Sequence, residues 1–147
     1  MTGWRIGYAA GPQPLIAAMK KIQSQSTSNP TSISQVAAQA ALEGDQQCVK
    51  DMVSAFKQRH DYMVKALNDI EGIECLAGDG TFYVFPDFSG LQKKLNCKTD
   101  TDLAEKLLEK GVALVPGSAF GTPGHMRISF ATSDESLQKA VKRLKTA

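Results

Sequence analysis

The 147-residue sequence lacks the cysteine patterns of a metal site or of a disulfide-stabilised protein. Its three cysteines, Cys48, Cys75 and Cys97, are widely spaced, no Cys-x-x-Cys pair occurs, and only His60 and His125 could join them. Zinc sites use several thiolate or imidazole ligands at short spacing, so the sequence predicts no metal site. Free thiols are typical of a reducing compartment, and we expect a cytoplasmic protein.

The sequence also lacks long apolar runs and a charge excess of one sign. No stretch approaches the roughly 20 apolar residues of a membrane-spanning helix, and the N-terminus lacks the charged flank and apolar run of a signal peptide. The 17 basic side chains nearly balance the 15 acidic ones, which gives a net charge of +2. Proteins that bind a phosphate backbone carry a clear basic excess. We therefore expect neither a nucleic acid nor a membrane as partner.

The first half of the chain has mainly helical patterns. These patterns predict a strand over 4–10, a helix over 14–23, a loop over 25–34, and helices over 34–43 and 47–70. Apolar residues along the longest helix repeat at the three-and-four spacing of one buried face. A strand over 4–10 has no partner strand nearby in the sequence, so we expect it to pair elsewhere or to belong to a larger sheet.

The second half alternates short strands and helices. The patterns predict strands over 73–76, 81–85, 112–115 and 126–130, an irregular or weakly helical stretch over 91–98, and helices over 101–110 and from 133 onward. Ser133 can cap the last helix. Strand alternation over 126–130 directs Arg127 away from the core that takes Met126, Ile128 and Phe130.

Four motifs follow one another along the chain: Gly3-Trp4-Arg5-Ile6-Gly7-Tyr8, Gly80–Pro86, Val115–Gly121 and Met126–Ala131. In this order they resemble the C-terminal portion of fold-type I pyridoxal-phosphate aminotransferases of the aspartate aminotransferase type. The resemblance implies an α/β fold in three parts. Residues 1–33 would be a remnant of the large cofactor-binding domain, including one of its strands, 34–71 the interdomain helical connector, and 72–147 the small C-terminal α+β domain.

The resemblance also implies the chemistry. A full-length parent would transfer an amino group between an amino acid, with aspartate as a candidate, and a 2-oxo acid. It would use pyridoxal 5'-phosphate and would be a homodimer. Arg5 matches the family's arginine on the cofactor phosphate, and Arg127 matches its arginine on the substrate's α-carboxylate. A planar guanidinium that stays charged suits both anions. Tyr83 and Gly117 lie in motifs that the family places at the substrate site.

The family's Schiff-base lysine lies a few residues upstream of the motif that contains Arg5. We therefore expect Met1 to be an internal residue of a longer parent, the chain to contribute no catalytic residue, and the chain to be inactive by itself. A β-lyase or related enzyme on the same scaffold would share Arg5 and Arg127, and a non-catalytic module could use Arg127 alone to bind a carboxylate. The residues also allow plainer roles: Arg5 could pair with a surface acid, and Gly117 could be a structural turn. His60 is expected on the polar side of its helix and His125 in a loop, neither with a catalytic role.

Overall fold

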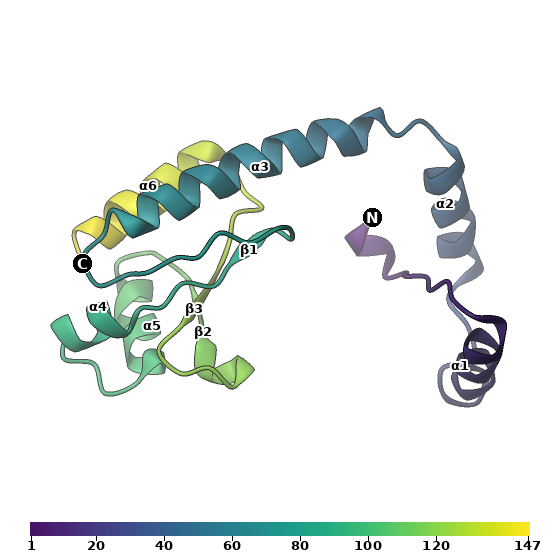
Figure 1. The fold of residues 1–147 in the computed structure, drawn as a ribbon, viewed down its shortest axis with the longest axis horizontal. Coiled ribbons are helices and arrows are strands. Elements are labelled where there is room, and N and C mark those ends of the chain that lie inside the picture. Colours follow the sequence, from purple (N-terminus) through teal and green to yellow (C-terminus); the bar gives the residue numbers. More distant parts are fainter. The chain divides into compact units, whose positions relative to one another are not determined.

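The computed structural model describes all 147 residues, which form two compact units, Met1–Lys50 and Asp51–Ala147. Helices dominate the chain, and the second unit also contains a small antiparallel sheet (Figure 1). No helix is long and apolar enough to cross a membrane.

The first unit contains a short 3-10 helix, η1 (Thr2–Trp4), the helices α1 (Gln13–Ser26) and α2 (Ser32–Glu43), and the start of α3 (Gln47–Asn68). Both helices flanking the predicted loop are longer than expected, so the loop shrinks to residues 27–31. The prediction of a strand over 4–10 is wrong for this structure, because residues 5–12 have no regular structure. A strand requires a hydrogen-bonded neighbour, and the first unit contains no other strand.

The sheet of the second unit consists of β1 (Tyr83–Val84), β2 (Val115–Pro116) and β3 (Met126–Ser129), with the antiparallel order β1-β3-β2. The strand predicted over 73–76 is reduced to one bridge between Glu74 and Asp87. The Asn68 side chain explains this difference, since it accepts from the Cys75 N–H and donates to the Cys75 carbonyl, both at 2.8 Å. These are the groups that a neighbouring strand would have used.

Three further helices complete the second unit: α4 (Ser89–Lys94), α5 (Asp100–Glu109) and α6 (Asp134–Lys145). The predicted cap of α6 is confirmed, because the Ser133 hydroxyl accepts from the Ser136 N–H at 3.2 Å. A capping box between Thr99 and Asp102 starts α5. In Figure 1, α6 lies along the C-terminal half of α3.

One hydrophobic core holds the second unit together. Met126, Ile128 and Phe130 are at most 6% exposed, which confirms the predicted alternation along β3. The largest fully buried side chains come from α3, α5, β3 and the segments between them: Met63, Leu67, Pro86, Phe88, Leu103, Leu107, Met126 and Phe130. Since this core occupies one face of β3, Arg127 lies on the opposite face.

Candidate functional site

The candidate site lies on the face of the sheet opposite the core. Val115 pairs with Arg127 across β2 and β3, and Tyr83 pairs with Ser129 across β1 and β3. Residues directly opposite each other, or two apart on one strand, share a face of a sheet. Strand register therefore brings Tyr83, Val115 and Arg127 to one surface.

The guanidinium group of Arg127 lies over two aromatic rings. Its Cζ atom is 4.6 Å from the centre of the Tyr83 ring and 4.7 Å from the centre of the Phe120 ring. Each such cation–π contact contributes roughly 0.5–2 kcal/mol, depending on its exposure. Tyr83 in turn packs on Phe82 at 4.2 Å between ring centres, and Phe120 meets Phe85 edge to face at 6.0 Å. The arginine head group is thus held by rings that are themselves packed.

Arg127 has no polar partner within the chain. Of the four arginines, Arg59 forms an ion pair with Asp134 at 2.9 Å, and Arg143 donates to the Gly111 carbonyl at 2.7 Å. Arg5 and Arg127 form neither an ion pair nor a side-chain hydrogen bond in the chain. Because an arginine fork presents several N–H donors in one plane, the donors of Arg127 remain available to an anion.

Gly117 follows β2 directly and begins the 3-10 helix η2 (Gly117–Phe120). Its N–H donates to the His125 carbonyl at 2.7 Å. A Cβ atom at this position would overlap the Thr122 carbonyl oxygen and lie 2.8 Å from the His125 carbonyl oxygen. Gly117 is buried and permits this close approach. The tight loop that results carries Phe120 to Arg127.

Asp100 supports the same loop, a role that no motif in the sequence indicates. Its side chain is buried, with the residue 4% exposed, and its Oδ2 atom accepts from the Ser118 N–H at 2.7 Å. Burial raises the pKa of a carboxyl group, but hydrogen bonds from Ser118, Gly124 and Thr101 outweigh burial and hold the pKa of Asp100 below its usual value. Asp100 therefore remains ionised in the interior.

Arg5 belongs to the first unit, where it follows η1. Its backbone is left-handed, with φ 48° and ψ 47°, and its N–H donates to the Thr2 carbonyl at 3.2 Å. This conformation is uncommon for residues other than glycine. The side chain is exposed. An exposed guanidinium that forms no ion pair fits the requirement for a phosphate contact.

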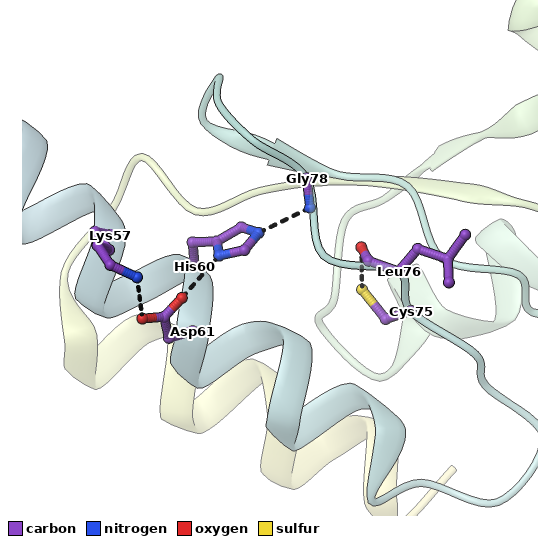
Figure 2. Close-up of polar contacts among 6 residues, drawn as sticks. All are labelled: Lys57, His60, Asp61, Cys75, Leu76 and Gly78. Atoms are coloured by element: carbon purple, nitrogen blue, oxygen red, sulfur yellow. Dashed lines mark hydrogen bonds and ion pairs between the residues drawn. The ribbon is translucent and has the colours of Figure 1, made fainter.

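His60 differs from its prediction, because it does not lie on the polar side of α3. Figure 2 shows its ring between Asp61 and the turn at Gly78. Nε2 accepts from the Gly78 N–H at 3.2 Å, Nδ1 lies 3.0 Å from an Asp61 carboxylate oxygen, and the ring meets Phe130 edge to face. The turn folds back on α3 and leaves the His60 side chain only 14% exposed. His60 therefore ties the turn that precedes β1 to the helix.

His125 lies immediately before β3, where its ring stacks on Phe85 at 5.2 Å between ring centres. Its Nδ1 atom is buried and has no hydrogen-bond partner.

The three cysteines are free, and burial raises the pKa of the Cys75 thiol. No group of three or more histidine, cysteine or acidic side chains is arranged to hold a metal ion.

The chain is similar to known proteins along almost its whole length. Residues 1–144 match the family described as aminotransferase class I and II. The chain is 54% identical over 151 residues to an aspartate/prephenate aminotransferase of Nitrosomonas europaea, covering 98% of this chain and 38% of that protein.

Solved structures agree with this similarity. The crystal structure of the aspartate aminotransferase from Rhizobium meliloti is 47% identical with a TM-score of 0.86, covering 100% of this chain and 38% of that one. The Thermus thermophilus aspartate aminotransferase with maleate is 40% identical with a TM-score of 0.82, covering 99% of this chain and 37% of that one. The chain thus spans less than two fifths of the length of these relatives.

Proposed function

Because the chain belongs to the class I and II aminotransferase family, and within it to the aspartate aminotransferase type, we propose that it supplies the substrate-carboxylate site of a transaminase. The complete protein transfers an amino group between an amino acid and a 2-oxo acid. One observation carries this proposal: the Arg127 guanidinium is held over Tyr83 and Phe120 and has no acidic partner. An arginine fixed in this way can bind a carboxylate through two parallel hydrogen bonds.

The role of Arg127 is to orient the substrate. A bidentate contact fixes the amino acid's α-carboxylate in position and direction, which converts a loose encounter into a productive geometry. Tyr83 lies beside this contact and limits the movement of the guanidinium. Gly117 shapes the neighbouring loop through its close approach to Thr122 and His125.

The family uses pyridoxal phosphate, and the exposed Arg5 fits a contact to the phosphate of this cofactor. When bound, the cofactor acts as an electron sink for the amino acid. The lysine that the family places before the motif of Arg5 is not among these 147 residues. We therefore propose that turnover requires a further segment of protein, and that the complete enzyme is a homodimer.

The substrate class follows from the carboxylate site and from the names of the relatives. Those names include aspartate and prephenate, and the Thermus thermophilus structure is of the enzyme with maleate. All three compounds carry more than one carboxylate. Arg59 and Arg143 already have partners in this chain, and Arg5 is assigned to the cofactor phosphate, so no arginine of this chain is left for a second substrate carboxylate. We propose aspartate as the amino donor on this basis.

A hybrid enzyme tests the proposal. This chain would replace the matching segment of the Nitrosomonas europaea enzyme, and transamination of aspartate would be measured with a 2-oxo acid. We expect activity, and a loss of kcat/KM on the order of 100-fold or more in Arg127→Ala, because the substrate loses its orientation. Arg59→Ala, which removes the ion pair with Asp134 and a cation–π contact with Phe56, is the matched control. An active hybrid in which Arg127→Ala behaves like the control would contradict the role of Arg127.

A second experiment tests the dependence on a further segment. The purified 147-residue chain would be incubated with pyridoxal phosphate, reduced with borohydride and weighed by intact-mass spectrometry. We expect no stoichiometric adduct at a single lysine and no turnover. A specific adduct at Lys20 or Lys21 together with turnover would show that the chain is a complete catalyst.

A further inference from the structure

The second unit contains a buried carboxylate, that of Asp100, which has no role in the proposed function. Asp100 is the first residue of α5 and is 4% exposed. No basic side chain forms an ion pair with it, so its buried charge is stabilised by backbone N–H groups. An ionised carboxylate without such partners is strongly disfavoured in the interior. The hydrogen bonds that it accepts are therefore strong constraints on the segments that donate them.

One of those segments is the loop 117–124. The N–H of Ser118, at the start of the loop, donates to Asp100 Oδ2 at 2.7 Å. Beyond Ser118 the chain reverses at Gly121, whose φ is +78°. Asp100 thereby ties the Ser118 end of this loop to α5.

This loop carries Phe120, whose ring lies 4.7 Å from the Arg127 Cζ atom. Phe120 is 48% exposed, so burial alone does not determine where its ring lies. Tyr83 differs in this respect, because the pairing of β1 with β3 determines its position. The placement of the Phe120 ring over Arg127 thus depends on how the loop backbone is held.

We propose that Asp100 is a positioning residue for the Arg127 site. Its carboxylate fixes the Ser118 end of the loop, the loop places the Phe120 ring, and the ring restricts the orientation of the guanidinium. This inference rests on the proposed function, in which Arg127 binds the substrate's carboxylate. Asp100 would thus affect substrate binding without touching the substrate's carboxylate.

The test uses the 147-residue chain, isotope-labelled and studied by NMR with maleate as the carboxylate probe. A guanidinium over an aromatic ring has side-chain protons shifted upfield by the ring current. We expect Asp100→Asn to move the Ser118 amide proton, to reduce the ring-current shift at Arg127, and to raise the Kd for maleate. A rise of roughly threefold to tenfold corresponds to the weakening of one charge-assisted hydrogen bond.

Asp102→Asn is the matched control. Asp102 lies in the same first turn of α5, but its carboxylate accepts the Thr99 N–H and does not contact the loop. We expect this change to destabilise the helix and to leave the Arg127 signals and the Kd unchanged. If Asp100→Asn also leaves both unchanged, or if Asp102→Asn changes them equally, the inference is overturned.

The same experiment separates this inference from the proposed function. If the wild-type chain does not bind maleate, or binds it no more tightly than the Arg127→Lys variant does, the assignment of the carboxylate site to Arg127 is wrong. The Ser118 and Arg127 signals still report whether Asp100 positions the loop.

If Asp100→Asn does not fold, Asp100→Glu is the second variant. It keeps the charge, displaces the carboxylate by one methylene, and is expected to move the same signals. Unchanged signals in a folded Asp100→Glu chain would overturn the inference.

Discussion

The Cζ atom of Arg127 on β3 lies 4.6 Å from the centre of the Tyr83 ring on the neighbouring strand β1. Tyr83 is paired with Ser129, so its ring reaches Arg127 diagonally across the two strands. A shift of the register by one residue would move Tyr83 to the core face of the sheet. The pairing of these short strands and the geometry of the candidate site are therefore set by the same hydrogen bonds.

Tyr83→Ala is expected to weaken carboxylate binding at Arg127 by roughly threefold to tenfold, which is the size of one partly exposed cation–π contact. Tyr83→Phe keeps the ring and is the matched control, with a Kd close to that of the wild type. The measurement is the Kd for maleate from NMR titration of the chain. Equal weakening in both variants would assign the effect to the tyrosine hydroxyl and contradict a role for the ring.

Local periodicity explains why the position of Arg127 was predictable. The alternation along residues 126–130 depends only on a strand forming there, and the structure confirms it. The ring of Phe120 could not be predicted in the same way, because its place depends on a loop held by a distant carboxylate. Asp102 stands three residues after Thr99, the spacing of a capping box, whereas no local pattern gives Asp100 a partner. The role of Asp100 becomes visible only in its tertiary contact with Ser118.

Strands were predicted less well than helices for a related reason. The helices have apolar spacing within their own sequence, and α5 and α6 also have side-chain caps there, whereas a strand depends on a partner. The Asn68 side chain takes both backbone groups of Cys75, so the strand expected over 73–76 does not form. The strand expected over 4–10 finds no partner in its unit. The division into 1–33, 34–71 and 72–147, and the roles of Arg5, Tyr83, Gly117 and Arg127, stay predictions.

Gly117→Ala is expected to destabilise the second unit by about 1–3 kcal/mol, the usual cost of inserting a methyl group into a packed site. The added Cβ atom would meet the carbonyl oxygens of Thr122 and His125, which belong to the backbone and cannot rotate away. The free energy of unfolding in urea is the measurement. Gly80→Ala is the control, because a Cβ atom at Gly80 has no neighbour within 4 Å. Equal stability of the two variants would mean that the loop relaxes without loss.

His60→Ala is expected to release the turn at Gly78 from α3. The variant removes the acceptor of the Gly78 N–H and the ring that packs on Phe130. We expect faster hydrogen exchange at the Gly78 amide and a loss of about 1 kcal/mol or more in stability. Lys57→Ala on the same helix removes only an exposed ion pair with Asp61, and such pairs contribute little. Hydrogen exchange at the Gly78 amide that is as slow in His60→Ala as in Lys57→Ala would contradict the inference that His60 holds this turn to α3.

The buried carboxylate of Asp100 predicts how stability depends on pH. Hydrogen bonds from Ser118, Gly124 and Thr101 outweigh burial, so the pKa of Asp100 is lower in the folded chain than in the unfolded one. A group of this kind stabilises the fold above its unfolded pKa of about 4, and its contribution is lost as the pH falls through the lower folded value. The free energy of unfolding of the wild type should therefore drop between about pH 6 and about pH 3, and the drop should be smaller in Asp100→Asn. Urea titrations of the wild type and of Asp100→Asn, at about pH 6 and at about pH 3, measure these free energies of unfolding. A wild type and an Asp100→Asn variant that lose stability equally would show that the pKa of Asp100 does not change on folding.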